Sequence, residues 1–325
     1  MSSIREVAKL AGVSPATVSR VINNSANVDE EKKDRVLRVI SETGFVPNEV
    51  ARSLFKKSAK TIGLILPSIE NPFFTQLSSV IEQTADQYGY RIVLCNTGSD
   101  FKKERSMMQM LASMNADGII ITTSNEGIKS FIEHSDIPVV ITDRQIHKLT
   151  KADYVHCDHF EGGKLATRHL MDCGCKNIVC LKGPQELSSA RARYEGYQFV
   201  CKEHGYEEQA IECLYDYHAG LVATEELLKQ YPQVDGIVAC NDMVAISVYK
   251  VLHKKGIKVP EHIQIIGYDD IALASLMAPE LTTIRQPVED IGKMAAELIV
   301  CRRNEKKNEY VFKPQLIQRE TTKII

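Results

Sequence analysis

The stretch IREVAKLAGVSPATVSRVIN, residues 4–23, predicts two short helices separated by a tight turn. Ser3 and Glu6 have the spacing of a capping box, which satisfies two free backbone N–H groups at the start of a helix. The apolar stripe of this first helix is Val7, Ala8, Leu10 and Ala11. Gly12 then ends the helix, because glycine adopts the left-handed backbone conformation without strain.

The second helix of this stretch begins at a strong start signal. Ser14 is a typical N-cap, and Pro15 suits the first helical position, where no backbone N–H is needed. The inward positions are Val18, Val21 and Ile22, and the outward positions are Pro15, Ala16, Thr17, Ser19 and Arg20. This spacing is typical of the helix-turn-helix, whose second helix enters the major groove of DNA. The alternative is a small helical hairpin inside another fold.

The residues that follow extend this unit. Asp29 predicts the start of a third helix that ends near Thr43, with Gly44 after it. Residues 1–60 carry 11 Lys and Arg against 7 Asp and Glu, a net charge of +4, while the whole chain is −2, so the remainder is −6. A basic segment ahead of an acidic body indicates a phosphate-binding head on a soluble protein.

Two runs in the first 55 residues resemble a known family. They are VSPATVSRVIN at residues 13–23 and PNEVARSL at residues 47–54. In sequence and spacing they are similar to the headpiece of the lactose/galactose repressor (LacI/GalR) family, and the similarity continues to the end of the chain. The resemblance implies a bacterial transcriptional regulator with a hinge helix near residues 48–55. So short a helix is unstable alone in water, so we expect it to form only on DNA.

The resemblance also implies which side chains contact DNA. The predicted DNA-binding residues are Pro15, Ala16, Thr17, Ser19, Arg20, Asn48, Ala51 and Leu54. Pro15, Ala16 and Arg20 match base-reading positions, and the Arg20 guanidinium can form two hydrogen bonds to guanine. Thr17 is expected to contact phosphate, as is Ser19. Leu54 matches the wedge that enters the minor groove; the alternative is that it packs on the next domain.

The length and composition bound the rest of the chain. With 325 residues, 44% of them hydrophobic and 25% charged, the chain is too long for one core. It has no run of eighteen apolar residues and no signal-peptide pattern, so we expect a cytoplasmic protein that does not contact membranes. The nine cysteines are odd in number, lack a Cys-x-x-Cys pair and include Cys95, Cys180 and Cys240 in apolar runs. These features favour buried, reduced thiols, with no metal or cofactor.

From Thr61 onward, short apolar runs alternate with amphipathic helical stretches. The predicted strands are Ile62–Leu66, Arg91–Cys95, Gly118–Thr122, Val139–Thr142, Val155–Cys157, Ile178–Leu181, Ile211–Tyr215, Gly236–Cys240, Ile263–Tyr268 and Thr282–Ile284. Such strands with helical crossovers predict parallel sheets covered on both faces. Asp117–Ile121 recurs as Asp235–Ala239, which indicates one fold used twice. The family resemblance likewise implies a two-lobed domain like the periplasmic binding proteins.

The predicted fold is therefore an N-terminal all-α helix-turn-helix headpiece followed by an α/β domain with two parallel, doubly wound sheets. The headpiece is expected at residues 1–58, and the effector-binding and dimerisation domain at 61–325. By analogy with the family, each lobe is discontinuous in sequence. We expect the first lobe at about 61–157 and 287–305, and the second at about 158–286 and 306–325.

In open parallel sheets, ligands bind beyond the carboxyl ends of the strands, and two facing lobes form a cleft there. The candidate effector-binding residues at these ends are Phe73, Phe74, Asp143, Arg193, Tyr215, Asn241 and Asp269. Aromatic rings, carboxylates, an amide and a guanidinium suit a sugar. Arg193, Asn241 and Asp269 match effector-binding positions of the family.

Other interpretations of these residues stay open. If Arg193 does not bind effector, it is a surface charge at the start of a helix. If Asp269 does not bind effector, it is only an N-cap. Phe74 and Tyr215 are otherwise part of the core. Two further basic residues, Arg144 and Arg191, are typical of ion pairs or interfaces, but would favour a sugar acid or phosphate if they faced the cleft. His159 departs from the family, which commonly has Asn after the equivalent of Asp158.

Together these patterns predict an allosteric repressor of a carbohydrate-use operon, with a monosaccharide or a derivative as effector. A homodimer would bind a palindromic operator, and with no apolar heptads after Glu320 we expect no tethered tetramer. One alternative is a global carbon regulator controlled by a phosphorylated carrier protein. Another is a nucleobase-responsive repressor, because Phe73 and Phe74 could stack on a base. Without dinucleotide, Walker or nucleophile-elbow motifs, we expect no enzyme.

Overall fold

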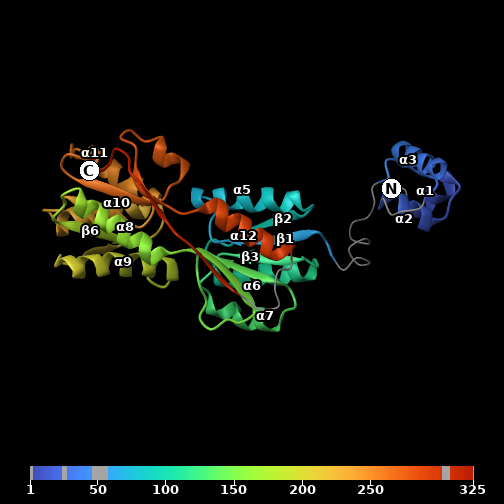
Figure 1. Ribbon diagram of the computed structural model, residues 1–325, viewed down its shortest axis with the longest axis horizontal. Helices are drawn as coiled ribbons and strands as arrows, with labels where there is room; N and C mark the ends of the chain where they lie inside the picture. The colour runs from blue at the N-terminus through green and yellow to red at the C-terminus, as the bar shows by residue number, and fades with distance from the viewer. Residues whose placement is uncertain (1–2, 24–27, 46–57, 302–307, 325) are drawn as a thin grey trace. The chain divides into compact units, whose positions relative to one another are not determined.

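The computed structural model describes residues 3–23, 28–45, 58–301 and 308–324 (Figure 1). The chain divides into two compact units, Met1–Ala59 and Lys60–Ile325. The predicted hinge residues Asn48, Ala51 and Leu54 lie outside the described residues.

The first unit contains three helices: α1 (Ile4–Ala11), α2 (Pro15–Ile22) and α3 (Glu30–Thr43). The predicted capping box is present, because the Ser3 hydroxyl accepts from the backbone N–H of Glu6 at 3.3 Å and the Glu6 carboxylate accepts from that of Ser3 at 3.4 Å. Gly12 ends α1 at φ +64°. The Ser14 hydroxyl caps α2 by accepting from the backbone N–H of Thr17 at 3.1 Å.

The helices of this unit enclose a small core. Its buried members are Val7, Ala8, Ala11, Val18, Val21, Val36 and Val39. The prediction that Leu10 is buried is wrong, since 60% of this side chain is exposed and it is not part of the core cluster. On α2 the outward face is as predicted: Pro15, Ala16 and Arg20 are exposed, and Thr17 and Ser19 are half-buried.

The second unit contains two lobes, each built on a six-stranded sheet (Figure 1). The first sheet has the order β11-β5-β4-β3-β1-β2. Its strands are β1 (Thr61–Leu66), β2 (Arg91–Asn96), β3 (Gly118–Ile121), β4 (Val139–Thr142), β5 (Ala152–Cys157) and β11 (Glu309–Phe312). Its helices are α5 (Pro72–Gln87), α6 (Phe101–Ser113), α7 (Lys129–His134) and α12 (Val288–Val300). All pairs in this sheet are parallel.

The second sheet repeats this order as β12-β10-β9-β8-β6-β7. Its strands are β6 (Ile178–Lys182), β7 (Gln209–Glu212), β8 (Gly236–Ala239), β9 (Gln264–Asp269), β10 (Thr282–Arg285) and β12 (Gln315–Ile317). Its helices are α8 (His159–Asp172), α9 (Ser188–His204), α10 (Tyr217–Gln230) and α11 (Asp242–Lys254). The recurring Asp-Gly-Ile segments begin β3 and β8, which hold equivalent places in the two sheets.

Both sheets are covered on both faces, as the continuous apolar strands predict. In the first lobe, α5 and α12 pack on one face through a cluster that includes Leu64, Ile81 and Ile299. Met108 and Leu111 of α6 pack on the other face. In the second lobe, α8 and α9 cover one face, and α10 and α11 the other. Residues on both faces of the inner strands β1, β3, β4, β6, β8 and β9 are therefore buried.

Several strand boundaries differ from the sequence-based expectation, and three differences affect the lobes, the sheets or the cleft. Residues 309–312, expected in the second lobe, form β11 and pair in parallel with β5 of the first lobe. The chain enters the second lobe only at β12, which pairs antiparallel with β10, so the second sheet is not purely parallel. The strand expected at Ile211–Tyr215 lies at Gln209–Glu212, which leaves Leu214 and Tyr215 in the loop beyond its carboxyl end.

Candidate functional site

A cleft of about 650 Å³ lies between the carboxyl ends of the two sheets, and all seven predicted effector residues line it. Phe73 and Phe74 lie in the first turn of α5, and Asp143 directly follows β4. Arg193 lies on α9, and Tyr215 in the loop after β7. Asn241 follows β8, and Asp269 ends β9. The rule that placed them, ligand binding beyond the carboxyl ends of parallel strands, therefore brought residues up to 196 positions apart into one cavity.

The aromatic wall of the cleft is also part of the first-lobe core. Phe73 and Phe74 are 2% and 6% exposed and pack edge to face, with ring centroids 5.1 Å apart. The Asn71 carboxamide caps α5 by accepting from the backbone N–H of Phe73 at 3.0 Å. Rings fixed in this way present a rigid apolar surface to the cleft.

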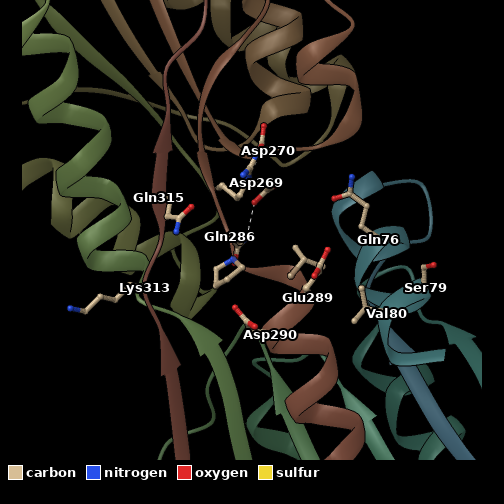
Figure 2. A pocket seen from close by; sticks show the side chains of 13 residues that line it. Gln76, Ser79, Val80, Asp269, Asp270, Gln286, Glu289, Asp290, Lys313 and Gln315 are labelled. Atoms are coloured by element: carbon tan, nitrogen blue, oxygen red, sulfur yellow. Dashed lines mark hydrogen bonds and ion pairs between the residues drawn. The ribbon is translucent and has the colours of Figure 1, made fainter. Parts of the chain in front are cut away.

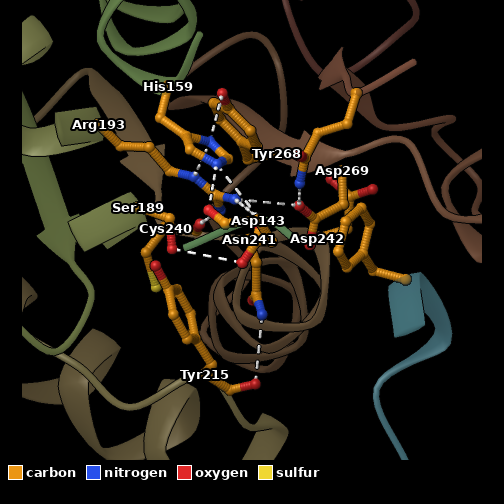
Figure 3. A network of polar contacts seen from close by, with 12 residues as sticks. Asp143, His159, Ser189, Arg193, Tyr215, Cys240, Asn241, Asp242, Tyr268 and Asp269 are labelled. Carbon is orange, nitrogen blue, oxygen red and sulfur yellow. Dashed lines mark hydrogen bonds and ion pairs between the residues drawn. The ribbon is translucent and has the colours of Figure 1, made fainter. Parts of the chain in front are cut away.

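Arg193 is the centre of the polar network in Figure 3. Its Nη1 donates to the carbonyl oxygen of Cys240 at 2.8 Å, and its guanidinium carbon lies 3.7 Å from the ring centroid of Tyr268. Its Nη2 lies 3.5 Å from Asp269 Oδ1 and 4.0 Å from Asp143 Oδ1. The guanidinium is thus immobilised between residues of both lobes, which excludes the alternative of a free surface charge.

The pKa values of the two aspartates beside Arg193 are shifted in opposite directions. Burial alone would raise the pKa of Asp143, but its contact with His159 and the charges of Arg193 and Arg144 lower it below its usual value. Burial raises the pKa of Asp269 to about 7, although Arg193 and a hydrogen bond from Gln286 oppose the shift. Asp143 is therefore the permanent anion of the site, and Asp269 titrates near neutrality.

The backbone at both aspartates is unusual. Asp143 has φ +63° and Asp269 has φ +111°, and residues other than glycine rarely adopt such positive φ values. Strained backbone of this kind is concentrated at functional sites, where the surrounding structure holds it in place.

Asn241 and Tyr215 are fixed to each other on the second-lobe side. The Asn241 Nδ2 donates to the carbonyl oxygen of Tyr215 at 3.2 Å, and its Oδ1 caps α11 by accepting from the N–H of Val244 at 2.9 Å. Asn241 therefore acts as an N-cap as well as a cleft residue. The Tyr215 hydroxyl is buried without a hydrogen-bond partner.

Sequence reasoning undervalued three residues. Arg144 lines the cleft, is 6% exposed, and its Nε is buried without a hydrogen-bond partner. Glu104 also lines the cleft and accepts hydrogen bonds from Thr123 and Asn125 at 2.9 and 3.1 Å. Gln286 holds Asp269 at 2.8 Å, while its own Oε1 has no partner. Gln286 directly follows β10, so the rule that selected the other residues could have found it. The same rule points to Arg144 after β4, for which an ion-pair or interface role was expected.

Two other expectations concern residues near the site. Arg191 is not part of the cleft lining; it lies 4.0 Å from Glu195 on the same helix and is 41% exposed, as expected for an ion-pair residue. His159 is buried directly behind Arg193, and its Nδ1 lies 3.3 Å from the Arg193 Nε.

A second cavity of about 610 Å³ is bounded by α5 and two crossovers between the lobes (Figure 2). Asp269 is the one predicted effector residue among its lining side chains. Asp270 in this cavity is neutralised by Arg285 and Arg319 at 2.6 and 2.7 Å. The first cavity, where all the predicted residues meet, is therefore the candidate effector site.

Within residues 3–23, 28–45, 58–301 and 308–324, no group of three or more His, Cys, Asp or Glu side chains is placed to hold a metal ion. Across the same ranges, no helix has both the length and the apolar composition needed to span a bilayer. Eight of the nine cysteines are buried free thiols, and Cys301 is exposed.

Comparison with protein families matches both units of the chain. Residues 3–48 match "Bacterial regulatory proteins, lacI family", and residues 59–319 match "Periplasmic binding proteins and sugar binding domain of LacI family".

Individual relatives cover the whole chain. The ribose operon repressor of Halalkalibacterium halodurans is 38% identical over 326 residues, covering 99% of this chain and 98% of the relative. The repressor PurR of Vibrio campbellii is 34% identical over 332 residues, covering 99% of each. A solved LacI-type regulator from Alkaliphilus metalliredigens, complexed with D-xylulofuranose, superposes with a TM-score of 0.73 at 33% identity. It covers 82% of this chain and 100% of that structure.

The chain belongs to the LacI family of bacterial transcriptional regulators. It joins a DNA-binding helix-turn-helix domain to a sugar-binding domain of two α/β lobes. The predictions of family, fold class and regulatory rather than enzymatic function are thereby confirmed.

Proposed function

We propose that the protein represses a pentose-use operon and that a neutral pentose of the D-ribose type is its effector. The proposal draws on the names of two similar proteins, a ribose operon repressor and a regulator complexed with D-xylulofuranose. It depends most on the polar atoms that the cleft leaves unsatisfied.

Buried polar atoms without partners are costly, so a site that keeps several is prepared for a ligand. Two such atoms belong to cleft residues: Arg144 Nε and the Tyr215 hydroxyl. Gln286 Oε1, next to Asp269 in the neighbouring cavity, is a third. Together with the carboxyl groups of Asp143 and Asp269, Arg144 and Tyr215 offer donors and acceptors within the cleft, which is what several sugar hydroxyls require because each hydroxyl both donates and accepts. Phe73 and Phe74 provide the apolar surface for the ring carbons.

The charge of the lining favours a neutral sugar over a sugar phosphate. The cleft is lined by two guanidinium groups, Arg144 and Arg193, and by six carboxyl groups, Glu70, Glu104, Asp143, Glu186, Asp216 and Asp269. Arg193 is already balanced by two of these carboxylates. A phosphate group would therefore enter an acidic cavity in which one cation is already neutralised, and its binding would be opposed.

We further propose that the protein is a homodimer on a palindromic operator. Several large apolar side chains are exposed on the edge strand β2 and in or directly after the helices α6 and α10 beside the edge strands β2 and β7: Leu94, Met110, Met114 and Val222. Exposed apolar groups along sheet edges are typical of a surface covered by a partner. A dimer would carry two headpieces, and α2 of each would read one half-site.

The effector acts in this proposal by changing the relation between the lobes. Because the cleft residues come from both lobes, a bound sugar favours one lobe arrangement, and this changes how the hinges present the headpieces. The shift requires unequal affinity for the two arrangements. Coupling of about 1–3 kcal/mol is typical and corresponds to a roughly five- to 150-fold change in operator affinity.

Isothermal titration calorimetry of the full-length protein tests the effector class. We expect saturable binding of D-ribose, and binding of ribose 5-phosphate that is at least tenfold weaker. A nucleobase is the second candidate, because PurR is similar over the whole chain. Binding of hypoxanthine with no binding of any pentose would replace the proposal by that alternative, and preference for the phosphate would contradict the charge argument.

A further inference from the structure

His159 is the first residue of α8, and the site just described does not require it to touch a ligand. It is 5% exposed and is not part of the cleft lining. Its neighbours nevertheless come from both lobes. Asp143 belongs to the loop after β4 in the first lobe, whereas Arg193 on α9 and Tyr268 on β9 belong to the second. The imidazole therefore joins the two lobes directly behind the effector-binding network (Figure 3).

The hydrogen-bonding chemistry of these neighbours fixes the state of the ring. His159 Nε2 lies 3.1 Å from the carbonyl oxygen of Asp143 and 3.2 Å from its Oδ1. Neither oxygen can donate, so Nε2 must carry the proton. On the other side, Arg193 Nε lies 3.3 Å from His159 Nδ1. A guanidinium N–H can only donate, so Nδ1 must be the acceptor. The neighbours thus admit one form, the neutral Nε2–H tautomer.

The electrostatic surroundings agree with this assignment. The charged and titratable side chains around the ring are Asp143, His156, Arg193 and Tyr268. Burial and the charge of Arg193 lower the pKa of His159, against the opposing effect of Asp143. The imidazole is therefore neutral at pH 7.

The hydrogen bond to His159 also orients the guanidinium of Arg193. The hydrogen bond from Nε to the imidazole fixes the rotation of the guanidinium in its plane, while Nη1 is held by the Cys240 carbonyl. The remaining Nη2 edge then faces Asp269 and Asp143. The same imidazole, through Nε2, anchors the strained loop at Asp143.

We propose that His159 is a positioning residue of the effector site, which, as the neutral Nε2–H tautomer, links Arg193 of the second lobe to Asp143 of the first and so sets the effector affinity. The proposal rests on the proposed function for the identity of the effector, a pentose. It specifies hydrogen bonding, rather than the shape of the ring, as what the site needs.

The first test is spectroscopic and needs no ligand. Long-range ¹H–¹⁵N correlation of the histidine rings in the full-length protein, assigned by loss of the signal in His159→Gln, reports the tautomer. We expect the Nε2–H form from pH 8 to pH 6. An Nδ1–H form or an imidazolium in this range would overturn the proposal, whether or not any pentose binds.

The second test compares His159→Gln with His159→Phe by calorimetry with D-ribose. The amide of Gln supplies one donor and one acceptor, so affinity should remain within about fivefold of the parent protein. Phe keeps the ring but leaves Arg193 Nε and the Asp143 carbonyl without a partner, and affinity should fall about tenfold or more. Equal affinities in both variants, or equal losses, would overturn the proposal, because hydrogen bonding would then not be what distinguishes them.

A matched control is available on the same helix. His169 is also buried, at 3% exposure, but it pairs with the Thr322 hydroxyl at 2.8 Å and lies outside the cleft lining. His169→Phe should lower the melting temperature and leave D-ribose affinity unchanged. An equal loss of affinity in His169→Phe and His159→Phe would overturn the positioning role. If the parent protein binds no pentose, the proposed function fails, while the tautomer measurement still decides the assignment of His159.

Discussion

Replacing Asp269 by Asn should make the effector-free protein more stable at alkaline pH while impairing its response to effector. Burial raises the pKa of Asp269 to about 7, whereas the same carboxyl in the unfolded chain has its ordinary pKa of 3.8. Above pH 7 the folded protein therefore holds a buried carboxylate that the unfolded chain would solvate. Asn avoids this cost and can keep the hydrogen bond from Gln286, because its amide oxygen accepts as well.

The size of the effect follows from linkage. A folded pKa above the unfolded value means that this group destabilises the fold progressively as pH rises from about 4 to 7, and by a constant amount above 7. At about 1.4 kcal/mol per pKa unit, the full penalty is about 4 kcal/mol. Between pH 5 and pH 8 the wild type should therefore lose roughly 2 to 3 kcal/mol relative to Asp269→Asn.

Urea unfolding of both proteins at pH 5 and pH 8 measures this difference, with the second unit followed by far-UV circular dichroism. We expect the advantage of the variant to grow with pH and its D-ribose affinity to fall. A stability difference that is the same at both pH values would show that Asp269 is ionised throughout, and would refute the electrostatic reasoning for this site.

Three further substitutions test separate parts of the molecule. Arg193→Ala should abolish the effector response and leave operator affinity unchanged in gel-shift titrations, since Arg193 contacts both aspartates of the cleft; a variant that still responds would move the site elsewhere. Arg20→Ala should weaken specific operator binding by about 1–3 kcal/mol while nonspecific binding changes little, and equal losses in both would remove its base-reading role. Gly163→Ala should lower the free energy of unfolding by about 1–3 kcal/mol, because a Cβ at this position would lie 2.0 Å from the carbonyl oxygen of Arg193 and would push α8 away from α9. An unchanged melting temperature would contradict that packing.

The parts of the fold that the sequence predicted are those with strong local or periodic signals. The helix-turn-helix follows from caps at Ser3 and Ser14 and the glycine after α1. The core strands follow from apolar runs long enough to be buried on both faces. The cleft residues follow from one topological rule, because parallel strands of a doubly wound sheet carry their ligands at one edge.

The parts that could not be predicted depend on contacts distant in sequence. β11 and β12 are four- and three-residue edge strands with mixed burial, and nothing local assigns them to one lobe or the other. Leu10 has the spacing of a buried residue, but α1 meets its neighbours through a narrower face. The place of Arg144 after β4 can be read from the sequence, but the inward orientation of its side chain cannot. Arg144 directly follows Asp143 at φ +63°, and a positive φ at an aspartate leaves no signal in the sequence.

The central claim is that a sugar held between the lobes changes how strongly the headpieces hold DNA. Fluorescence anisotropy with a labelled palindromic duplex selected by the full-length protein, titrated with and without saturating D-ribose at fixed salt, measures it directly. The account predicts that D-ribose weakens binding to this duplex by about five- to 150-fold and leaves binding to random duplex unchanged. Superimposable curves with and without the sugar, under conditions where calorimetry detects its binding, would contradict it.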